Sequence, residues 1–306
     1  MYTEEYLSDL DKSIKMIPLT FDVAFKSVML KNVDLFKEFL IKTMYLDLTE
    51  EDNYILFLDK ELIKQHFKEH GKVVDMNIKI GKDLLINVEL NTEKYSLVKR
   101  RNDLYLEKLD TLSFEVGESY QKLNNKYIYQ LNLNSHKEEN IHIGEKIIVP
   151  YDIKNHEVDD DRSKIFVKNL VFYRNKYYND KKSSNFDEIF LASLTSRSFY
   201  EFYHIISHIL SGERLKYLME SVMDMSKDEF VLHAWEKEKM DKMVQDNIKR
   251  DAFEEGNIEG IKQGIEQNKV DIIKSMLENN ITYELISKVT GKSTEEIKEI
   301  EKSIKD

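Results

Sequence analysis

Residues 73–91 constrain the fold of this chain most. Apolar and polar residues alternate in two segments on either side of a short turn, which predicts a β-hairpin. The sequence is VVDMNIKI, then GKD, then LLINVELN. If residues 81–83 form a three-residue loop, a common hairpin connection, Ile80 pairs with Leu84. Every even-numbered strand residue is then apolar and lies on one face. We expect this register to be strongly fixed, because a slip of one residue would move the whole apolar set to the other face.

The opposite face of this hairpin carries two carboxylates at facing positions. In the register above, Asp75 lies opposite Glu89, with Cβ atoms about 4.5–5.5 Å apart. Two like charges at that distance raise each other's proton affinity unless a positive charge lies between them. Mg²⁺ prefers such oxygen ligands, and a bound metal of this kind can activate water and polarise a phosphoryl oxygen. The pattern therefore predicts a Mg²⁺ (or Mn²⁺) site. The alternative is a solvated hairpin face that holds two acids.

Composition excludes several other kinds of site. The 306 residues include 57 acidic and 46 basic side chains, a net charge of −11, which argues against a simple basic nucleic-acid coat protein. The absence of Cys excludes a disulfide framework, a thiolate zinc site and a Cys nucleophile. Nine Gly and two Pro favour long helices, and neither GxGxxG nor GxxxxGK[ST] occurs.

Targeting signals are not expected either. The first 13 residues are acidic and have no apolar core of a signal peptide. No apolar run approaches the roughly 18–20 residues that span a bilayer. We expect a cytoplasmic protein with no membrane partner.

Hydrophobic periodicity predicts strands and helices in the first part of the chain and helices alone from about residue 186. We expect Thr20 to cap the first of two short helices. The predicted helices are 21–30, 33–45 and 94–123, and the further predicted strands are 126–134, 141–149 and 164–174.

Several short motifs together resemble the PD-(D/E)xK nuclease superfamily, and more closely the bacterial recombination-promoting nuclease and transposase (Rpn-type) family. Their order and spacing follow the family pattern over most of the chain. They are Asp22-Val23-Ala24-Phe25-Lys26 for D-x-x-F-K, Asp75 for the metal Asp, Glu89-Leu90-Asn91 for Glu-x-Gln, Gly117-Glu118-Ser119-Tyr120 for G-x-x-Y, and a tail with Gly256, Gly260, Gly264 and Thr290-Gly291-Lys292-Ser293.

This resemblance implies a restriction-endonuclease-like α/β fold, with a mixed central sheet flanked by helices and an all-helical C-terminal region. We expect a nuclease domain over residues 1–185, a helical extension over 186–230 and a charged helical tail over 231–306. The implied activity is metal-dependent hydrolysis of DNA, associated with recombination or mobile elements. The alternative is a nuclease-fold protein that acts as a DNA-binding or protein-interaction scaffold.

The resemblance also assigns roles to individual residues. Asp75 and Glu89 would bind Mg²⁺ or Mn²⁺. Asn91 stands where the superfamily usually has a lysine, and its amide can orient water or a phosphate oxygen but cannot act as a cationic base. Lys94, or Lys79 on the same hairpin face, would supply the positive charge instead.

Asp22 would be a helix-borne member of the same site, with Glu38 on the next helix as a weaker candidate. Asp22 and Lys26 are spaced i,i+4, so the alternative is a surface ion pair worth about 0.2–0.5 kcal/mol.

Basic and aromatic residues outside the hairpin offer further binding candidates. Lys99, Arg100 and Arg101 could neutralise DNA phosphates, or could form a solvated helix face. The tyrosine-rich segment 173–178 could stack bases, although a strand end followed by a loop is the favoured reading. The spacing of His204 and His208 permits zinc binding, but a core or surface pair is favoured because no third ligand is evident.

The tail reads as a long charged helix over 231–278, followed by a helix-turn-helix-like end. Asn279-Asn280 would break the long helix, Thr282 would cap the next, Gly291 would end it, and Ser293 with Glu296 would form a capping box. The last helix is rich in Glu, which repels phosphate, so we favour a regulatory or assembly tail. The long helix could pair with a copy of itself through its charged stripe and its glycine face.

Overall fold

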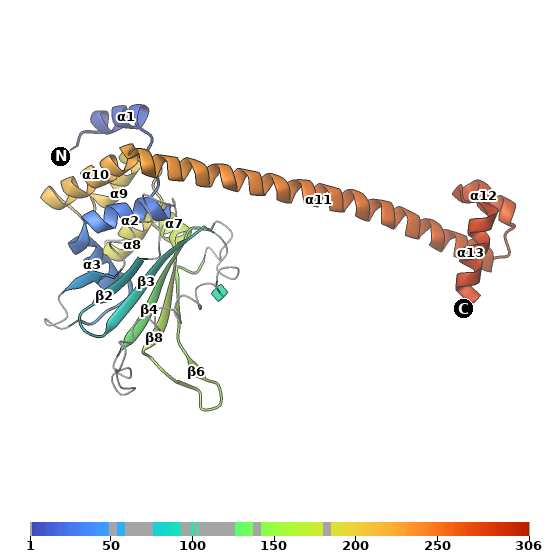
Figure 1. Ribbon diagram of the computed structural model, residues 1–306, viewed down its shortest axis with the longest axis horizontal. Helices are drawn as coiled ribbons and strands as arrows, with labels where there is room; N and C mark the ends of the chain where they lie inside the picture. The colour runs from blue at the N-terminus through green and yellow to red at the C-terminus, as the bar shows by residue number, and fades with distance from the viewer. Residues whose placement is uncertain are drawn as a thin grey trace. The chain divides into compact units, whose positions relative to one another are not determined.

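The computed structural model divides the chain into two compact units, Met1–Glu236 and Lys237–Asp306 (Figure 1). The residues it describes are 2–48, 54–58, 76–92, 99–100, 103, 126–136, 142–179 and 185–305.

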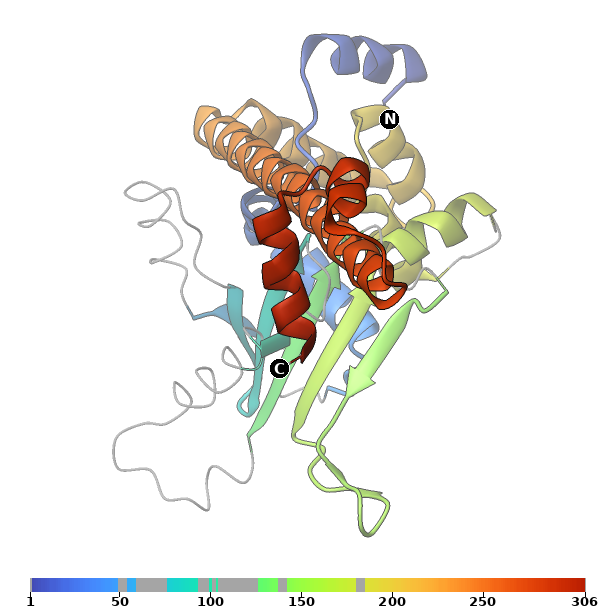
Figure 2. The ribbon, with the colours of Figure 1, turned by 90° about the vertical axis from the view of Figure 1, so that its right-hand side faces the viewer.

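The first unit is built on a six-stranded mixed sheet with the order β1-β2-β3-β4-β8-β5 (Figure 2). Strands β3, β4 and β8 are parallel, and the other pairings of the sheet are antiparallel. A separate two-stranded ribbon pairs β6 with β7. The α/β architecture predicted from the sequence is therefore present. The strands are β1 (Ile55–Phe57), β2 (Met76–Ile80), β3 (Leu84–Asn91), β4 (Tyr127–Asn134), β5 (Glu145–Ile148), β6 (Tyr151–Asp152), β7 (Glu157–Val158) and β8 (Ser163–Asn169).

The hairpin of β2 and β3 confirms the predicted register. Ile80 pairs with Leu84 and Met76 pairs with Val88. Gly81 opens the three-residue turn with φ 61°, a left-handed conformation that glycine adopts without a steric penalty. The apolar face of β2 and β3 is buried, with Ile78, Ile86 and Val88 fully inaccessible.

Helices of the first unit pack against that apolar face and form one hydrophobic core with it (Figure 1). Phe25, Phe36 and Phe39 contribute large side chains that are completely buried. Segment 186–227, predicted to be helical, belongs to the same core. The helices are α1 (Glu4–Ser13), α2 (Asp22–Lys31), α3 (Val33–Thr43), α7 (Leu170–Asn179), α8 (Phe186–Ser193), α9 (Phe199–Ile206) and α10 (Gly212–Lys227).

Two local predictions in this unit are wrong. Phe21, not Thr20, is the N-cap of α2, and it makes no side-chain capping bond. Residues 170–179 form a helix rather than the end of a strand and a loop. The reason is Asn169, whose Oδ1 accepts hydrogen bonds from the backbone N–H groups of Val171 at 3.1 Å and Phe172 at 3.2 Å. This side chain satisfies free N–H groups of the first helical turn, so the strand passes directly into a helix.

The C-terminal region is helical, as predicted. It comprises α11 (Glu229–Glu278), α12 (Tyr283–Thr290) and α13 (Thr294–Lys305). Thr282 is the N-cap of α12, and Gly291 ends it with φ 74°. The capping box is formed, because Ser293 N donates to Glu296 Oε2 at 2.8 Å and Glu296 N donates to Ser293 Oγ at 3.3 Å.

None of the described helices combines the length and the apolar character needed to cross a bilayer.

Candidate active site

The odd-numbered residues of β3 lie on the face of the sheet opposite to the helical core. In this layer Asn87 pairs with Gln130, Glu89 with Asn132, and Asn91 with Asn134, across the parallel ladder of β3 and β4. The strands thus place three rows of polar side chains next to one another.

These polar side chains are buried. Asn87 is 1% exposed, Glu89 8% and Asn91 3%. Gln130, Asn132 and Asn134 are at most 1% exposed. On β3 this face is therefore not solvated, whereas Asn77 and Lys79 on β2 are half-buried. A buried carboxylate needs a partner because its desolvation costs several kcal/mol.

The first polar row is a hydrogen-bond chain. Gln130 Nε2 donates to Asn87 Oδ1 at 3.0 Å, and Asn87 Nδ2 donates to Asn77 Oδ1 at 3.1 Å. Three adjacent strands are linked in this way. This row has a structural role.

The third polar row is tied to the backbone just beyond the strand ends. Asn134 Oδ1 accepts the N–H of His136 at 2.7 Å. Asn169, which pairs with Asn134 on β8, caps the start of α7 as described above. Asn134 thus orders the chain just after β4, and Asn169 starts the helix that follows β8.

The middle row differs from its neighbours. Asn132 is completely buried, and neither its Oδ1 nor its Nδ2 has a hydrogen-bond partner among the described residues. Leaving a buried polar group without a partner costs about 1–3 kcal/mol, and such a group needs an explanation. Its neighbour in the row is Glu89, the predicted metal ligand.

This row lies near the carboxyl ends of the parallel strands β3 and β4. In open α/β sheets, ligands bind outside the carboxyl ends of the strands. The position, the carboxylate and the amide without a partner in the described part of the chain all favour a polar ligand at this end of the sheet.

Several predicted site residues lie outside the described residues. They are Asp75, Lys94 and Arg101, as is the G-x-x-Y segment 117–120. Lys99 and Arg100 are described and exposed. Lys99 pairs with Asp103 at 2.8 Å, one helical turn away.

Asp22 and Lys26 form the ion pair that their spacing predicts, at 2.7 Å on α2. The Lys26 side chain is only 3% exposed and that of Asp22 33%, so this is not a simple surface pair. Breaking an ion pair with a buried member costs more than breaking an exposed one.

Glu38 is held by two cations on the helical side of the unit. Arg214 lies 2.6 Å and Lys42 2.9 Å from its carboxylate. Burial opposes its ionisation, but the hydrogen bonds from Arg214 and Lys42 outweigh burial and lower the pKa of Glu38. These contacts favour a role in joining α3 to α10.

The two histidines and the tyrosine-rich segment meet in a packed cluster. The Tyr177 hydroxyl lies 3.3 Å from His204 Nδ1 and 3.5 Å from His208 Nδ1. Tyr173 and Tyr177 are buried on α7 and offer no open surface for base stacking, whereas Tyr178 is 46% exposed.

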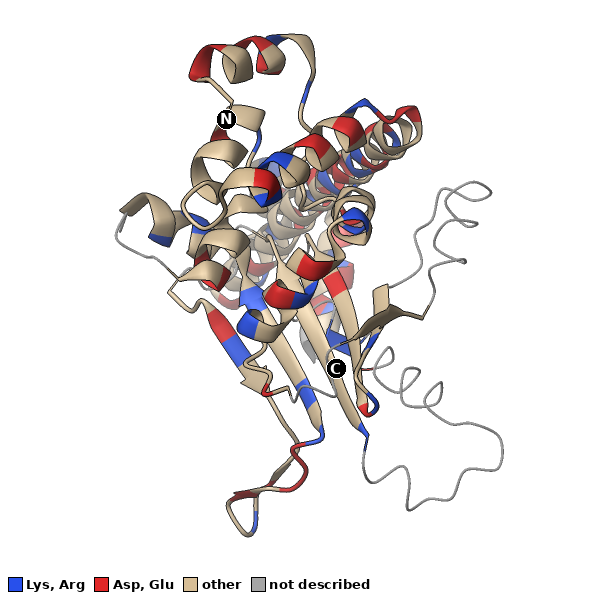
Figure 3. Cartoon of the chain, turned by 90° about the vertical axis from the view of Figure 1, so that its left-hand side faces the viewer, with Lys and Arg blue, Asp and Glu red and all other residues tan. Residues whose placement is uncertain are grey.

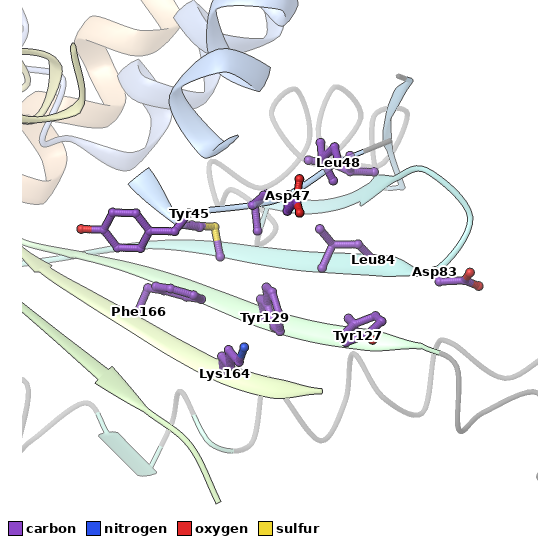
Figure 4. A pocket seen from close by; sticks show the side chains of 12 residues that line it. Tyr45, Asp47, Leu48, Asp83, Leu84, Tyr127, Tyr129, Lys164 and Phe166 are labelled. Atoms are coloured by element: carbon purple, nitrogen blue, oxygen red, sulfur yellow. The ribbon is translucent and has the colours of Figure 1, made fainter. Parts of the chain in front are cut away.

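A pocket of about 420 Å³ opens on the helical face of the sheet, near the first residues of β3 and β4 (Figure 4). Tyr127, Tyr129 and Phe166 line it from the strands, and residues 44–48 line it from above. Burial raises the pKa of Tyr129 to about 12. This pocket contains none of the predicted site residues, because alternate residues of a strand point to opposite faces.

Comparison with family models, curated proteins and solved structures finds no match to this chain. Within the described part of the chain, no three His, Cys, Asp or Glu side chains cluster as metal ligands would.

Sequence reasoning missed Asn132. The signal was present in the alternating segment KYIYQLNLN, which predicts that Gln130, Asn132 and Asn134 share a face. Alternation within one strand could not show that this face continues the face of Glu89, because β3 and β4 are joined by a long connection.

Proposed function

We propose that this protein is a metal-dependent endonuclease that hydrolyses phosphodiester bonds of DNA in the cytoplasm, with a restriction-endonuclease-like core and a role in recombination or mobile elements. The observation that carries the proposal is the row of Glu89 and Asn132. It puts a buried carboxylate beside a completely buried amide that has no partner among the described residues, near the carboxyl ends of two parallel strands.

The donor set of this row fits Mg²⁺ or Mn²⁺. Both prefer oxygen ligands, which the Glu89 carboxylate and the Asn132 carbonyl supply. Glu89 and Asp75 would hold the ion. When bound, such an ion stabilises negative charge on a phosphoryl group and lowers the pKa of water.

The surrounding side chains have separate tasks in this proposal. Asn132 would donate from Nδ2 to a water or phosphate oxygen beside Glu89, and Asn91 would orient a second oxygen. Asp22 would complete the acidic part of the site, with Lys94 as the cation. Lys99, Arg100 and Arg101 would contact DNA phosphates, which position the duplex without reading its sequence.

The test is a plasmid assay with purified protein, Mg²⁺ or Mn²⁺, and a chelator control. We expect metal-dependent nicking that falls at least about 100-fold in Asp75→Asn and Glu89→Gln, a loss of the size seen when a group that stabilises the transition state is removed. Glu157→Gln is the matched control, because Glu157 is exposed on β7 and should leave nicking unchanged.

Nicking that survives both substitutions would overturn the site assignment. Circular dichroism and thermal unfolding of each variant separate loss of the site from loss of the fold.

One observation favours a second function, that of a non-catalytic DNA-binding protein. Asn91 is 3% exposed at the position where the superfamily has a lysine, so an uncharged amide is built into the sheet there. This function predicts that labelled duplex DNA binds, as followed by fluorescence anisotropy, while no strand is cut with either metal.

A further inference from the structure

The second half of α11 carries a stripe of exposed isoleucines. Ile258 is 55% exposed, Ile261 56%, Ile265 55% and Ile272 43%. A 50-residue helix with acidic and basic residues along its length bears this stripe (Figure 3). Large apolar side chains aligned in water mark an interaction surface, because their burial against a partner removes apolar area from water.

The spacing of the stripe is that of a coiled coil. The steps from Ile258 to Ile261 and from Ile261 to Ile265 are three and four residues. The next two steps, through Asn268 to Ile272, are again three and four. Ile258, Ile265 and Ile272 then occupy a positions, and Ile261 and Asn268 occupy d positions. A polar residue within such a seam fixes its register at some cost in stability.

The core beside the stripe is small. In the described part of the second unit, Ile273, Ile286 and Ile297 are the buried residues of the cluster that joins α11 to α12 and α13. So few buried side chains give a helical unit little stability, and such units are commonly completed by oligomerisation.

We propose that the seam from Ile258 to Ile272 pairs with the same seam of a second copy of this chain, as a parallel, in-register two-stranded coiled coil. This inference does not depend on the proposed nuclease activity.

Charge decides the orientation. Lys262 and Lys269 occupy the e positions of the seam. An antiparallel pair brings e positions of the two helices together, so lysine would face lysine. A parallel pair brings each e position next to the g position five residues earlier on the partner. Lys262 then faces Asn257 and Lys269 faces Gly264, which are uncharged, while Asp271 at the next g position faces Met276.

The heptad positions before the seam add a second charge argument. Arg250 at g would face Glu255 at e of the partner copy, an attractive pair. Asp251 at a and Glu254 at d would face their own copies and repel, so the apolar contact begins after Glu254.

The glycine face only borders this seam. By the 100° step per residue, Gly256 lies on the opposite side of the helix from Ile258 and Ile261, Gly260 lies to the side of Ile261, and Gly264 occupies a g position at the edge of the seam. An added Cβ at any of these glycines would meet nothing within 4 Å.

The first test is the mass of the full-length protein by size-exclusion chromatography with light scattering. We expect twice the chain mass for the wild type and the mass of one chain for Ile261→Asp with Ile265→Asp. Phe253→Asp is the matched control, because Phe253 is 73% exposed on the same helix at a c position and should leave the dimer intact. Helix content by circular dichroism confirms that the variants fold.

The second test uses the absence of native Cys. Ile261→Cys and Asn268→Cys, made in separate chains, should each give a covalent dimer on oxidation, because d residues of a parallel in-register pair face their own copies. Covalent dimer from only one of the two variants would overturn the parallel register. A wild type with the mass of one chain, or a dimer that survives the double aspartate substitution, would overturn the seam itself.

Discussion

The two faces of the central sheet are made from alternate residues of the same strands, yet one is apolar and the other is polar. On β3, Ile86 and Val88 point into the helical core, while Asn87, Glu89 and Asn91 point the other way. Both faces are buried. Few charged residues lie in the central strands (Figure 3).

The two faces differ in how their burial affects the free energy of unfolding. Burial of the apolar face stabilises the fold, because each side chain leaves water without losing hydrogen bonds. Burial of the polar face lowers stability unless every amide finds a partner. In the described part of the chain, two polar rows have partners and Asn132 in the middle row has none. Each of the following predictions tests one side of this comparison.

The largest effect is expected on the apolar face. Ile86→Ala removes three buried carbons from the fully inaccessible core. We expect the free energy of unfolding to fall by about 2–5 kcal/mol, from lost burial and the cavity left behind. Urea denaturation measures this, with Ile147→Ala as control. Ile147 is 47% exposed on β5, and its substitution should cost less than about 0.5 kcal/mol. Equal losses would contradict the assignment of the core.

The second-largest loss of stability is expected in the first polar row, which contains Asn87. Asn87→Ala removes the acceptor of Gln130 Nε2 and the donor to Asn77. We expect a loss of about 1–3 kcal/mol in urea denaturation, because a buried hydrogen-bond chain is cut. Asn155→Ala is the control, since Asn155 bonds Asp152 in an exposed turn. If both variants lose the same stability, the buried row has no special role.

In the middle row, a substitution should raise the free energy of unfolding instead of lowering it. Asn132→Leu replaces an amide that has no hydrogen-bond partner among the described residues with an apolar side chain of similar size. We expect the free energy of unfolding to rise by about 1 kcal/mol while metal-dependent nicking falls, the trade-off common at functional sites. Asn134→Leu is the matched control. It removes the acceptor of the His136 N–H and should lower stability. A stability loss in both variants would remove Asn132 from the proposed site.

The smallest effect concerns the helices that cover the apolar face. The pKa of Glu38 is lowered from its ordinary 4.5, so its contribution is present above that value and is lost as pH falls. Between neutral pH and about pH 3, Glu38→Gln should lose less stability than the wild type, by about 0.2–1 kcal/mol. Denaturant unfolding at both pH values measures this, and Glu157→Gln should match the wild type. If Glu38→Gln loses as much stability at low pH as the wild type does, the prediction is contradicted.

Features set by neighbouring residues could be predicted from the sequence. The hairpin register follows from alternation and a three-residue turn, and both are local. The caps at Gly291 and Ser293 follow from short motifs for the same reason. The change from β8 to α7 could not be predicted, because an apolar and aromatic run is compatible with either structure. There the Asn169 side chain decides.

The sequence by itself determined that β3 has one apolar and one polar face, because side chains alternate with period two along any strand. Only the tertiary structure decided that the polar face is buried and that Asn132 stands beside Glu89. These two residues are 43 positions apart, and they meet because β3 and β4 pair in parallel across the connection between them. No local pattern fixes which strands become neighbours, so the middle polar row could be recognised only once the sheet was assembled.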